Sequence, residues 1–186
     1  MIEQSVSFSS NKKEMYEEVV LQLRGLFEDC PYMLANFANA SAVLNQAMED
    51  INWVGFYFLR SKDSKEGLET DYGKKEAGQE EEFLLVLGPF QGKPACVEIQ
   101  IGKGVCGTAV AKDEVMLVKD VHEFPGHIAC DAASRSEIVL PIHAGGKIVC
   151  VLDIDSPKLA RFDEEDKSGL KVVVKILEEM CENSSK

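Results

Sequence analysis

Three cysteines in the middle of the chain, Cys96, Cys106 and Cys130, have the side chains best suited to chemistry. They lie near glycines or within a polar segment, where a thiol can be partly exposed and can ionise. Cys106 falls in the first turn of an expected helix, whose dipole favours a thiolate. The pattern indicates redox or nucleophilic chemistry at one or more of these positions, with simple packing in the core as the alternative.

The segment around Cys130 also contains His122 and His127, either of which could donate a proton or stabilise a thiolate. Asp131 opposes thiolate formation through like-charge repulsion. The sequence lacks the paired C-x₂-C or H-x₃-H spacing of zinc fingers, although His127 and Cys130 are three apart. The run GKGVCG, residues 102–107, matches the letters of a dinucleotide fingerprint, but no βαβ unit surrounds it. We therefore expect no metal and no cofactor.

The other three cysteines are typical of packing positions. Cys150 lies in an apolar strand run, Cys181 in the last turn of the final expected helix, and Cys30 directly before Pro31. A buried cysteine ordinarily behaves as a small hydrophobic residue.

Acidic residues gather near the end of the last expected strand. Asp153 and Asp155 are two apart, so both side chains project to one side of that strand. Glu137 begins the preceding strand, and a hairpin through Gly145-Gly146 would bring it close to the aspartates. Carboxylates held together in this way could bind an ammonium group. The alternative is a solvated strand end.

The elements that must position these residues follow from periodicity and turn signals. Helical spacing predicts two N-terminal helices and a C-terminal helix that begins after Asp163, and a short helix over 104–112. Aromatic and β-branched runs predict strands between them, with turns at Gly88-Pro89 and near 92–94. Two helices, mostly hairpin-connected strands, and a final helix indicate an α+β fold with an antiparallel sheet. The expected segments are helices 11–29 and 33–49, strands 51–59, 83–88, 95–101, 115–118, 137–143 and 147–155, and a polar loop at 120–136.

The strand 95–101 has an instructive alternation. Val97, Ile99 and Ile101 would share one face, so Cys96 would point away from the apolar side.

Length and composition predict a single domain over residues 1–186. The chain has 186 residues, of which 45% are hydrophobic, and a charged 62–82 segment reads as a solvated loop insertion. A net charge of −12 makes nucleic acid and anionic membranes unsuitable partners. No run is long and apolar enough for a membrane span, and no secretory signal is visible, so we expect a cytoplasmic protein.

Six linked motifs resemble the free methionine-R-sulfoxide reductase family, which has a GAF fold. The motifs are INWVGFY, LGPFQGKPAC, GKGVCGTA, DVHEFPGHIACD, SEIVLPI and VLDIDS, and the likeness covers roughly residues 33–180 apart from the charged insertion. The resemblance implies a reductase that acts on free methionine sulfoxide rather than on methionine in proteins.

The resemblance also implies a role for each cysteine. Cys130 would attack the sulfoxide sulfur and become a sulfenic acid, which Cys96 would resolve as a disulfide. Cys106 would be a supporting or alternative resolving thiol. A bridge requires the two Cα atoms within about 7 Å, so the 120–136 loop should fold over the strand that contains Cys96. A thioredoxin-type dithiol would then restore the thiols.

Substrate-binding roles come from the same resemblance. The acidic positions Glu137, Asp153 and Asp155 would bind the amino group and polarise or protonate the sulfoxide oxygen, with one of them protonated. Crowded carboxylates raise one another's pKa, which would allow both functions in one site.

Backbone amides around Ile128, Ala129 and Cys130 would receive the substrate carboxylate. Trp53 and Tyr57, on one face of their strand, would either wall the substrate methyl group or simply belong to the core.

Two other readings stay open from sequence alone. One is a GAF module that binds a small molecule without catalysis, and the other is a structural or interaction protein. The family also includes dimers, so a homodimer is compatible with the resemblance.

Overall fold

The structure is a computed structural model that describes residues 7–62, 82–126 and 132–184. Within these ranges the chain forms helices at both ends and a sheet between them, in agreement with the α+β fold predicted from the sequence. The elements are α1 (Lys12–Phe27), α2 (Met33–Ala47), β1 (Trp53–Ser61), β2 (Phe83–Gly92), β3 (Glu98–Gln100), α3 (Gly104–Lys112), β4 (Met116–Val118), the one-turn 3₁₀ helix η1 (Val121–Glu123), β5 (Ser136–Ala144), β6 (Lys147–Ser156) and α4 (Glu164–Ser184). Almost all of the charged insertion lies outside the described residues.

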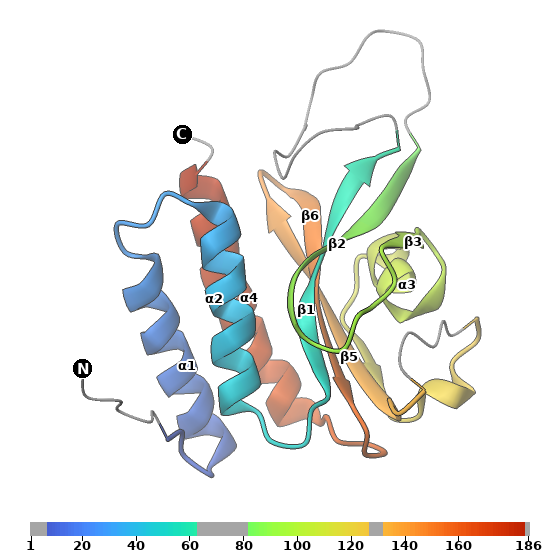
Figure 1. Cartoon of the computed structure of the whole chain (residues 1–186), viewed down its shortest axis with the longest axis horizontal. Coiled ribbons are helices and arrows are strands. Elements are labelled where there is room, and N and C mark those ends of the chain that lie inside the picture. Colours follow the sequence, from blue (N-terminus) through green and yellow to red (C-terminus); the bar gives the residue numbers. More distant parts are fainter. Residues whose placement is uncertain (1–6, 63–81, 127–131, 185–186) are drawn as a thin grey trace, which may run out of the picture.

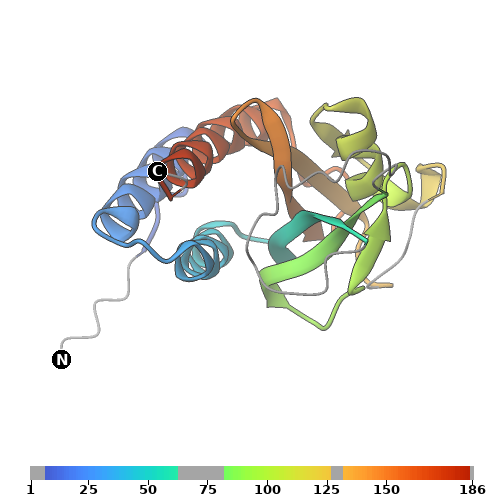
Figure 2. The same cartoon turned by 90° about the horizontal axis from the view of Figure 1, so that it is seen from above.

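The strands form one sheet in the order β3-β2-β1-β6-β5-β4, and every neighbouring pair is antiparallel. Figure 1 shows α1, α2 and α4 together on one side of this sheet and α3 on the other, and Figure 2 shows the same separation from above. The sheet therefore divides the molecule into a helical layer and an opposite face that α3 covers. None of the described helices is long and apolar enough to cross a membrane.

Alternation along β1 explains how both faces are filled. Val54, Phe56 and Phe58 belong to the core beneath the helical layer, whereas Trp53 and Tyr57 belong to the second core on the α3 face. Successive side chains of a strand point to opposite sides, so one aromatic-rich strand supplies both cores.

The hairpin between β5 and β6 sets the register of the acidic residues. Its two-residue loop is Gly145-Gly146, and both glycines have positive φ (57° and 75°), as a type I′ turn requires. This loop pairs Ala144 with Lys147 and, at the far end of the ladder, Glu137 with Asp155. A turn chosen by two glycines thus fixes which acidic side chains become neighbours.

The predicted turn at Gly88-Pro89 is wrong, because β2 continues through it to Gly92. The β1–β2 pairing shifts register between Gly55 and Tyr57, and β3 pairs with β2 only over Leu84–Val86. Pro89 therefore lies where one edge of β2 has no pairing strand, which is where a sheet tolerates proline.

The predicted strand over 95–101 is shorter than expected. Only Glu98–Gln100 is extended in the sheet, and Val97 is 64% exposed instead of sharing a buried face with Ile99. Cys96 lies in the irregular segment before β3, so strand alternation does not determine where its side chain points.

Asp163 caps the N-terminus of α4, as the sequence predicts. Its Oδ1 accepts hydrogen bonds from the backbone N–H groups of Glu165 and Asp166, both at 2.9 Å. These bonds satisfy two donors that would otherwise lack an intrahelical partner.

Candidate active site

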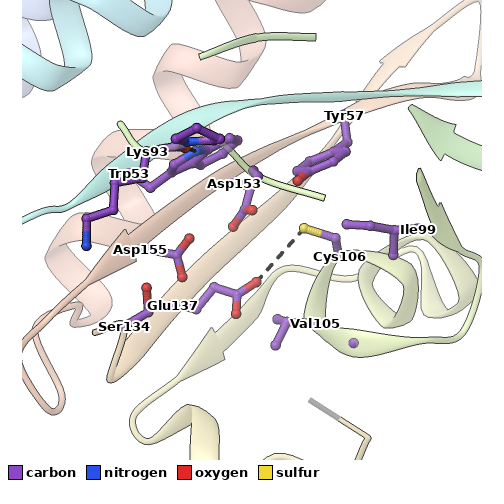
Figure 3. Close-up of a pocket in the computed structure, with 13 residues that line it drawn as sticks. Trp53, Tyr57, Lys93, Ile99, Val105, Cys106, Ser134, Glu137, Asp153 and Asp155 are labelled. Atoms are coloured by element: carbon purple, nitrogen blue, oxygen red, sulfur yellow. Dashed lines mark hydrogen bonds between the residues drawn. The ribbon is translucent and has the colours of Figure 1, made fainter. Parts of the chain in front are cut away.

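A pocket opens on the α3 face of the sheet, between α3, the ends of β5 and β6, and the segment that follows β2. It combines an aromatic and aliphatic wall with three carboxylates and one thiol, and Figure 3 shows most of these side chains. The lining residues are Trp53, Tyr57, Lys93, Pro94, Ala95, Ile99, Gly104, Val105, Cys106, Ser134, Glu137, Asp153 and Asp155.

The carboxylates reach the pocket because β5 and β6 alternate in step. Leu152 and Ile154 pack into the helical-layer core, which leaves Asp153 and Asp155 on the opposite face. Glu137 is the cross-strand partner of Asp155 in the β5–β6 ladder. The sequence prediction that these three side chains would lie together agrees with their arrangement in Figure 3.

The thiol of Cys106 enters the pocket from the first turn of α3. Gly104 begins this helix with a φ of 60°, and a Cβ atom on Gly107 would lie 2.3 Å from the carbonyl oxygen of Gln100. These two glycines allow α3 to approach the end of β3 closely. The Cys106 Sγ donates a long hydrogen bond to Glu137 Oε1, at 3.9 Å (Figure 3).

Burial without a counter-charge dominates the electrostatics of the two inner carboxylates. Glu137 and Asp153 are each 6% exposed, and within the described ranges neither forms an ion pair with a basic side chain. Burial raises the pKa of Asp153 to about 6, although Cys106 and Glu137 oppose the shift. Burial, followed by the charge of Asp153, raises the pKa of Glu137 well above its usual range. At neutral pH the pair therefore favours holding a proton.

The α3 dipole, which was expected to favour a thiolate at Cys106, does not control the protonation of this side chain. The side chain is 3% exposed, and burial together with the negative charges of Asp153 and Glu137 raises the pKa of the thiol well above its ordinary value. Desolvation and two nearby acids outweigh the dipole of a nine-residue helix. Cys106 is a neutral thiol that donates a hydrogen bond.

Trp53 and Tyr57 form the aromatic wall and also belong to the core of this face. Their rings stack with centroids 5.8 Å apart. The Trp53 Nε1–H donates to the carbonyl of Lys93 at 3.1 Å, and the Tyr57 hydroxyl donates to the carbonyl of Cys96 at 3.0 Å. The two rings thus hold the segment from Lys93 to Cys96 against the pocket.

Cys96 lies directly after this wall. Its thiol is free and partly exposed, and the residue itself is not among those that line the pocket, although Ala95 is. Ser134, which is 3% exposed, lines the pocket shortly after the segment that carries Cys130 in the sequence. His122 is exposed in η1.

Several predicted site residues lie outside the described residues. These are His127, Ile128, Ala129, Cys130 and Asp131. The predicted approach of Cys130 to Cys96 therefore stays a prediction. Among the described cysteines, Cys150 and Cys181 are buried as expected, and Cys30 is partly exposed.

Sequence reasoning did not single out Lys93, Ile99, Val105 or Ser134 as pocket residues. Lys93 and Val105 belong to motifs that were already conspicuous, GPFQGKPAC and GKGVCG, so the continuity of those motifs is a signal that could have found them. Ser134 carries no comparable signal, because it reaches the pocket only through the path of the chain before β5.

Known proteins resemble this chain over nearly its whole length. The GAF domain family model matches residues 40–178. The chain is 46% identical over 170 residues to free methionine-R-sulfoxide reductase from Escherichia coli (strain K12), covering 91% of this chain and 90% of that protein. It is 40% identical over 183 residues to free methionine-R-sulfoxide reductase from Saccharomyces cerevisiae, covering 95% and 92%.

A solved structure shows the same fold. The X-ray structure of free methionine-R-sulfoxide reductase from Neisseria meningitidis in complex with its substrate superposes with a TM-score of 0.79 at 41% identity. The match covers 97% of this chain and 96% of that one.

Proposed function

Because the chain belongs to the GAF domain family and, within it, to the free methionine-R-sulfoxide reductases, we propose that it reduces free methionine (R)-sulfoxide with Cys130 as the nucleophile and Cys96 as the resolving thiol. The chain is thus an oxidoreductase. The structural observation that supports the proposed binding and protonation of the substrate is the group of carboxylates in the pocket. The roles of Cys130 and Cys96 are supported by the sequence motifs that contain them.

The proposed cycle has three steps. The Cys130 thiolate attacks the sulfoxide sulfur and the sulfoxide oxygen takes up a proton; the S–O bond of the substrate then breaks, the oxygen is transferred to the Cys130 sulfur as a sulfenic acid, and methionine leaves. The Cys96 thiol then displaces water from that sulfenic acid and forms a disulfide. An external dithiol such as thioredoxin reduces the disulfide by exchange and returns both thiols. Such a cycle requires a reducing compartment, in keeping with a cytoplasmic location.

The carboxylates divide the work of binding and proton donation. Glu137, whose pKa is raised by burial and by Asp153, keeps its proton and donates it toward the sulfoxide oxygen as the S–O bond breaks. Asp155 is less buried than the other two and, with Asp153, attracts the substrate ammonium group. A protonated acid beside an ionised partner follows from crowding these carboxylates in a buried site.

The remaining wall suits the apolar part of the substrate. The rings of Trp53 and Tyr57 and the side chain of Ile99 line the pocket beside the carboxylates, where a methyl or methylene group would pack. Backbone amides around Ile128 and Ala129 are the proposed receptors for the substrate carboxylate.

Cys106 has a supporting role in this scheme. Its neutral thiol donates to Glu137 at 3.9 Å and so helps to orient the acid. Because burial and two acids suppress its ionisation, it is unsuited to be the attacking thiolate.

The decisive experiment is one substrate addition to reduced protein in the absence of a reductant, followed by peptide mass spectrometry. The expected result is stoichiometric methionine from the R epimer alone and a disulfide between Cys96 and Cys130. Cys96→Ser should still release one methionine but leave a sulfenic acid, whereas Cys130→Ser should release none. Cys30→Ser, far from the pocket between α1 and α2, is the matched control and should behave as wild type.

Two results would contradict the proposal. Methionine release by Cys130→Ser would remove that residue as the nucleophile. Tight binding of the sulfoxide with no turnover of either epimer would instead favour a GAF module that binds a ligand without catalysis.

A further inference from the structure

The pocket also contains a set of donor atoms with the composition of a metal site. One donor atom each from Cys106, Glu137 and Asp153 lies within 4.8 Å of the others, and all three residues are buried. Spacing in the sequence gives no hint of this group, because its members come from α3, β5 and β6. Spacing motifs detect only metal ligands that lie close together along the chain. For this reason the sequence predicted no metal site.

An unsatisfied atom points to a missing ligand within this group. The Oδ1 atom of Asp153 is fully buried and has no hydrogen-bond partner among the described residues, and the whole residue is only 6% exposed. Figure 3 shows the Asp153 carboxyl directed into the pocket, toward Cys106 and Glu137. Buried polar atoms are nearly always paired, so an orphaned carboxylate oxygen aimed at two further donors indicates a ligand that this atom would bind.

We propose that this group binds one thiophilic divalent cation of the Zn²⁺ class, through Cys106 Sγ and one oxygen each of Glu137 and Asp153, and that the cation inhibits the enzyme. On coordination the Cys106 thiol gives up its proton to solvent, and so does the carboxyl of the Glu137–Asp153 pair that holds one.

The geometry suits zinc with small side-chain adjustments. Zn–S and Zn–O bonds of about 2.3 and 2.1 Å at a tetrahedral angle separate the sulfur from the oxygen by about 3.6 Å. The observed separation of Cys106 Sγ and Glu137 Oε1 is 3.9 Å. A sulfur ligand favours Zn²⁺ over Mg²⁺ or Ca²⁺, which prefer oxygen ligands alone.

Inhibition follows from the position of the donors and rests on the proposed function. The cation would occupy the same two carboxylates that are proposed to bind and protonate the substrate. Methionine sulfoxide and the cation would therefore exclude one another.

Binding is tested without any turnover, by titrating Co²⁺ and then Zn²⁺ into reduced, desalted full-length protein. The expected result is one cation per chain, with the thiolate charge-transfer band and the visible absorption of four-coordinate Co²⁺, both lost on adding Zn²⁺. Cys106→Ser and Asp153→Asn should weaken binding by about 100-fold or more, since even indirect partners of a metal ligand contribute about 10- to 100-fold. Circular dichroism checks that each variant is folded.

Matched controls identify which thiol binds. Cys30→Ser and Cys130→Ser should leave the affinity and the Co²⁺ spectrum unchanged. If Cys130→Ser abolishes binding while Cys106→Ser retains it, or if folded Asp153→Asn binds as tightly as wild type, the proposed site is overturned.

The inhibitory part is tested by single-turnover release of methionine with no dithiol present, because dithiols themselves bind zinc. One equivalent of Zn²⁺ should slow release at low substrate, and excess methionine sulfoxide should restore the rate. Cys106-dependent binding with no effect on the rate would overturn inhibition while leaving the metal site in place. That outcome would also count against the placement of the substrate in this pocket.

Discussion

The sheet buries carboxylates on both faces, but the two sets have opposite surroundings. In the helical layer, Asp166 is fully buried and accepts hydrogen bonds from Tyr16 Oη at 2.9 Å, Lys12 Nζ at 2.6 Å and the backbone N–H of Asp163 at 3.1 Å. The Arg161 guanidinium adds a fourth contact at 3.2 Å. Two cations and two neutral donors thus surround one acid.

On the opposite face, Glu137 and Asp153 have almost nothing comparable. In the described part of the structure the donor assigned to this pair is the Cys106 thiol, at 3.9 Å from Glu137, and Asp153 Oδ1 has no partner. Burying a charge without a partner is costly, whereas a fully paired one is tolerated.

This difference indicates that the Asp166 cluster stabilises the fold, whereas the Glu137–Asp153 pair serves the function of the pocket. The Asp166 cluster fastens the N-terminus of α4 to α1, and both carboxylate oxygens of Asp166 are already paired with donors from the chain itself. The Glu137–Asp153 pair keeps its binding capacity at the expense of stability, as groups at functional sites often do. Gly169 emphasises the structural role of the first cluster, because a Cβ there would lie 2.1 Å from the Tyr16 ring.

The strongest test of this difference between the two faces is to remove the acid from the pocket. Glu137→Gln keeps the shape but cannot donate a carboxyl proton, so kcat/KM for the R-sulfoxide should fall by about 10²- to 10⁴-fold. Its midpoint of denaturation should stay the same or rise, since an uncompensated buried acid is gone. Initial rates and urea denaturation measure the two effects. Glu98→Gln, an exposed glutamate on β3, is the control, and a Glu137→Gln enzyme of normal rate would refute the assignment.

Replacing the buried acid of the helical layer by its amide should lower stability and leave activity nearly unchanged. Asp166→Asn leaves Lys12 and Arg161 without their shared anion, and we expect the free energy of unfolding to drop by about 2–4 kcal/mol, tempered by the partial solvation of Lys12. Methionine release well below the melting temperature should be nearly normal. A large loss of rate in a fully folded Asp166→Asn protein would show that the two clusters are coupled.

Much of the fold was predictable because local patterns coincide with tertiary packing. The apolar, β-branched runs at 137–143 and 147–155 and the glycine pair between them predicted a hairpin that the structure confirms, together with the shared side of Asp153 and Asp155. The continuation of β2 past Gly88-Pro89 was not predictable, because it depends on the register shift opposite it in β1.

The electrostatics of the site were harder to predict than its residues. A helix N-terminus is visible in sequence, so a thiolate at Cys106 was a reasonable expectation. The thiol is buried between two acids only because α3, β5 and β6 meet in the folded chain. This burial raises the pKa of the thiol, against the effect of the helix dipole. The Asp166 cluster was missed for the same reason, since Lys12 and Tyr16 lie about 150 positions away in the chain.

The two faces should also respond to pH in opposite directions. The pKa of Asp153 is raised from 3.8 to about 6, so the folded state holds this proton longer than the unfolded chain. Stability from this group is therefore greatest below pH 4 and falls as the pH rises through about 6, by on the order of 2–3 kcal/mol. Lys12 lowers the pKa of Asp163 to about 2, so its contribution is full above pH 4 and is lost as the pH falls toward 2.

Urea denaturation from pH 3 to 8 separates the two responses. Asp153→Asn should flatten the decline between pH 4 and 7, and Asp163→Asn should flatten the loss below pH 4. An unchanged slope in Asp153→Asn would mean that the pocket carboxylates do not hold extra protons in the folded state.

The smallest and most selective contrast uses two tyrosines that donate similar bonds on opposite faces. Tyr16→Phe removes one of several donors to Asp166, and Tyr57→Phe removes the donor to the Cys96 carbonyl. Each should lower the free energy of unfolding by about 1 kcal/mol. Only Tyr57→Phe should loosen the segment that carries Cys96, and so slow disulfide formation several-fold after an unchanged release of methionine. Rapid quenching followed by mass spectrometry resolves the two steps, and equal disulfide rates in both variants would show that the Tyr57 hydroxyl has only the structural role that Tyr16 has.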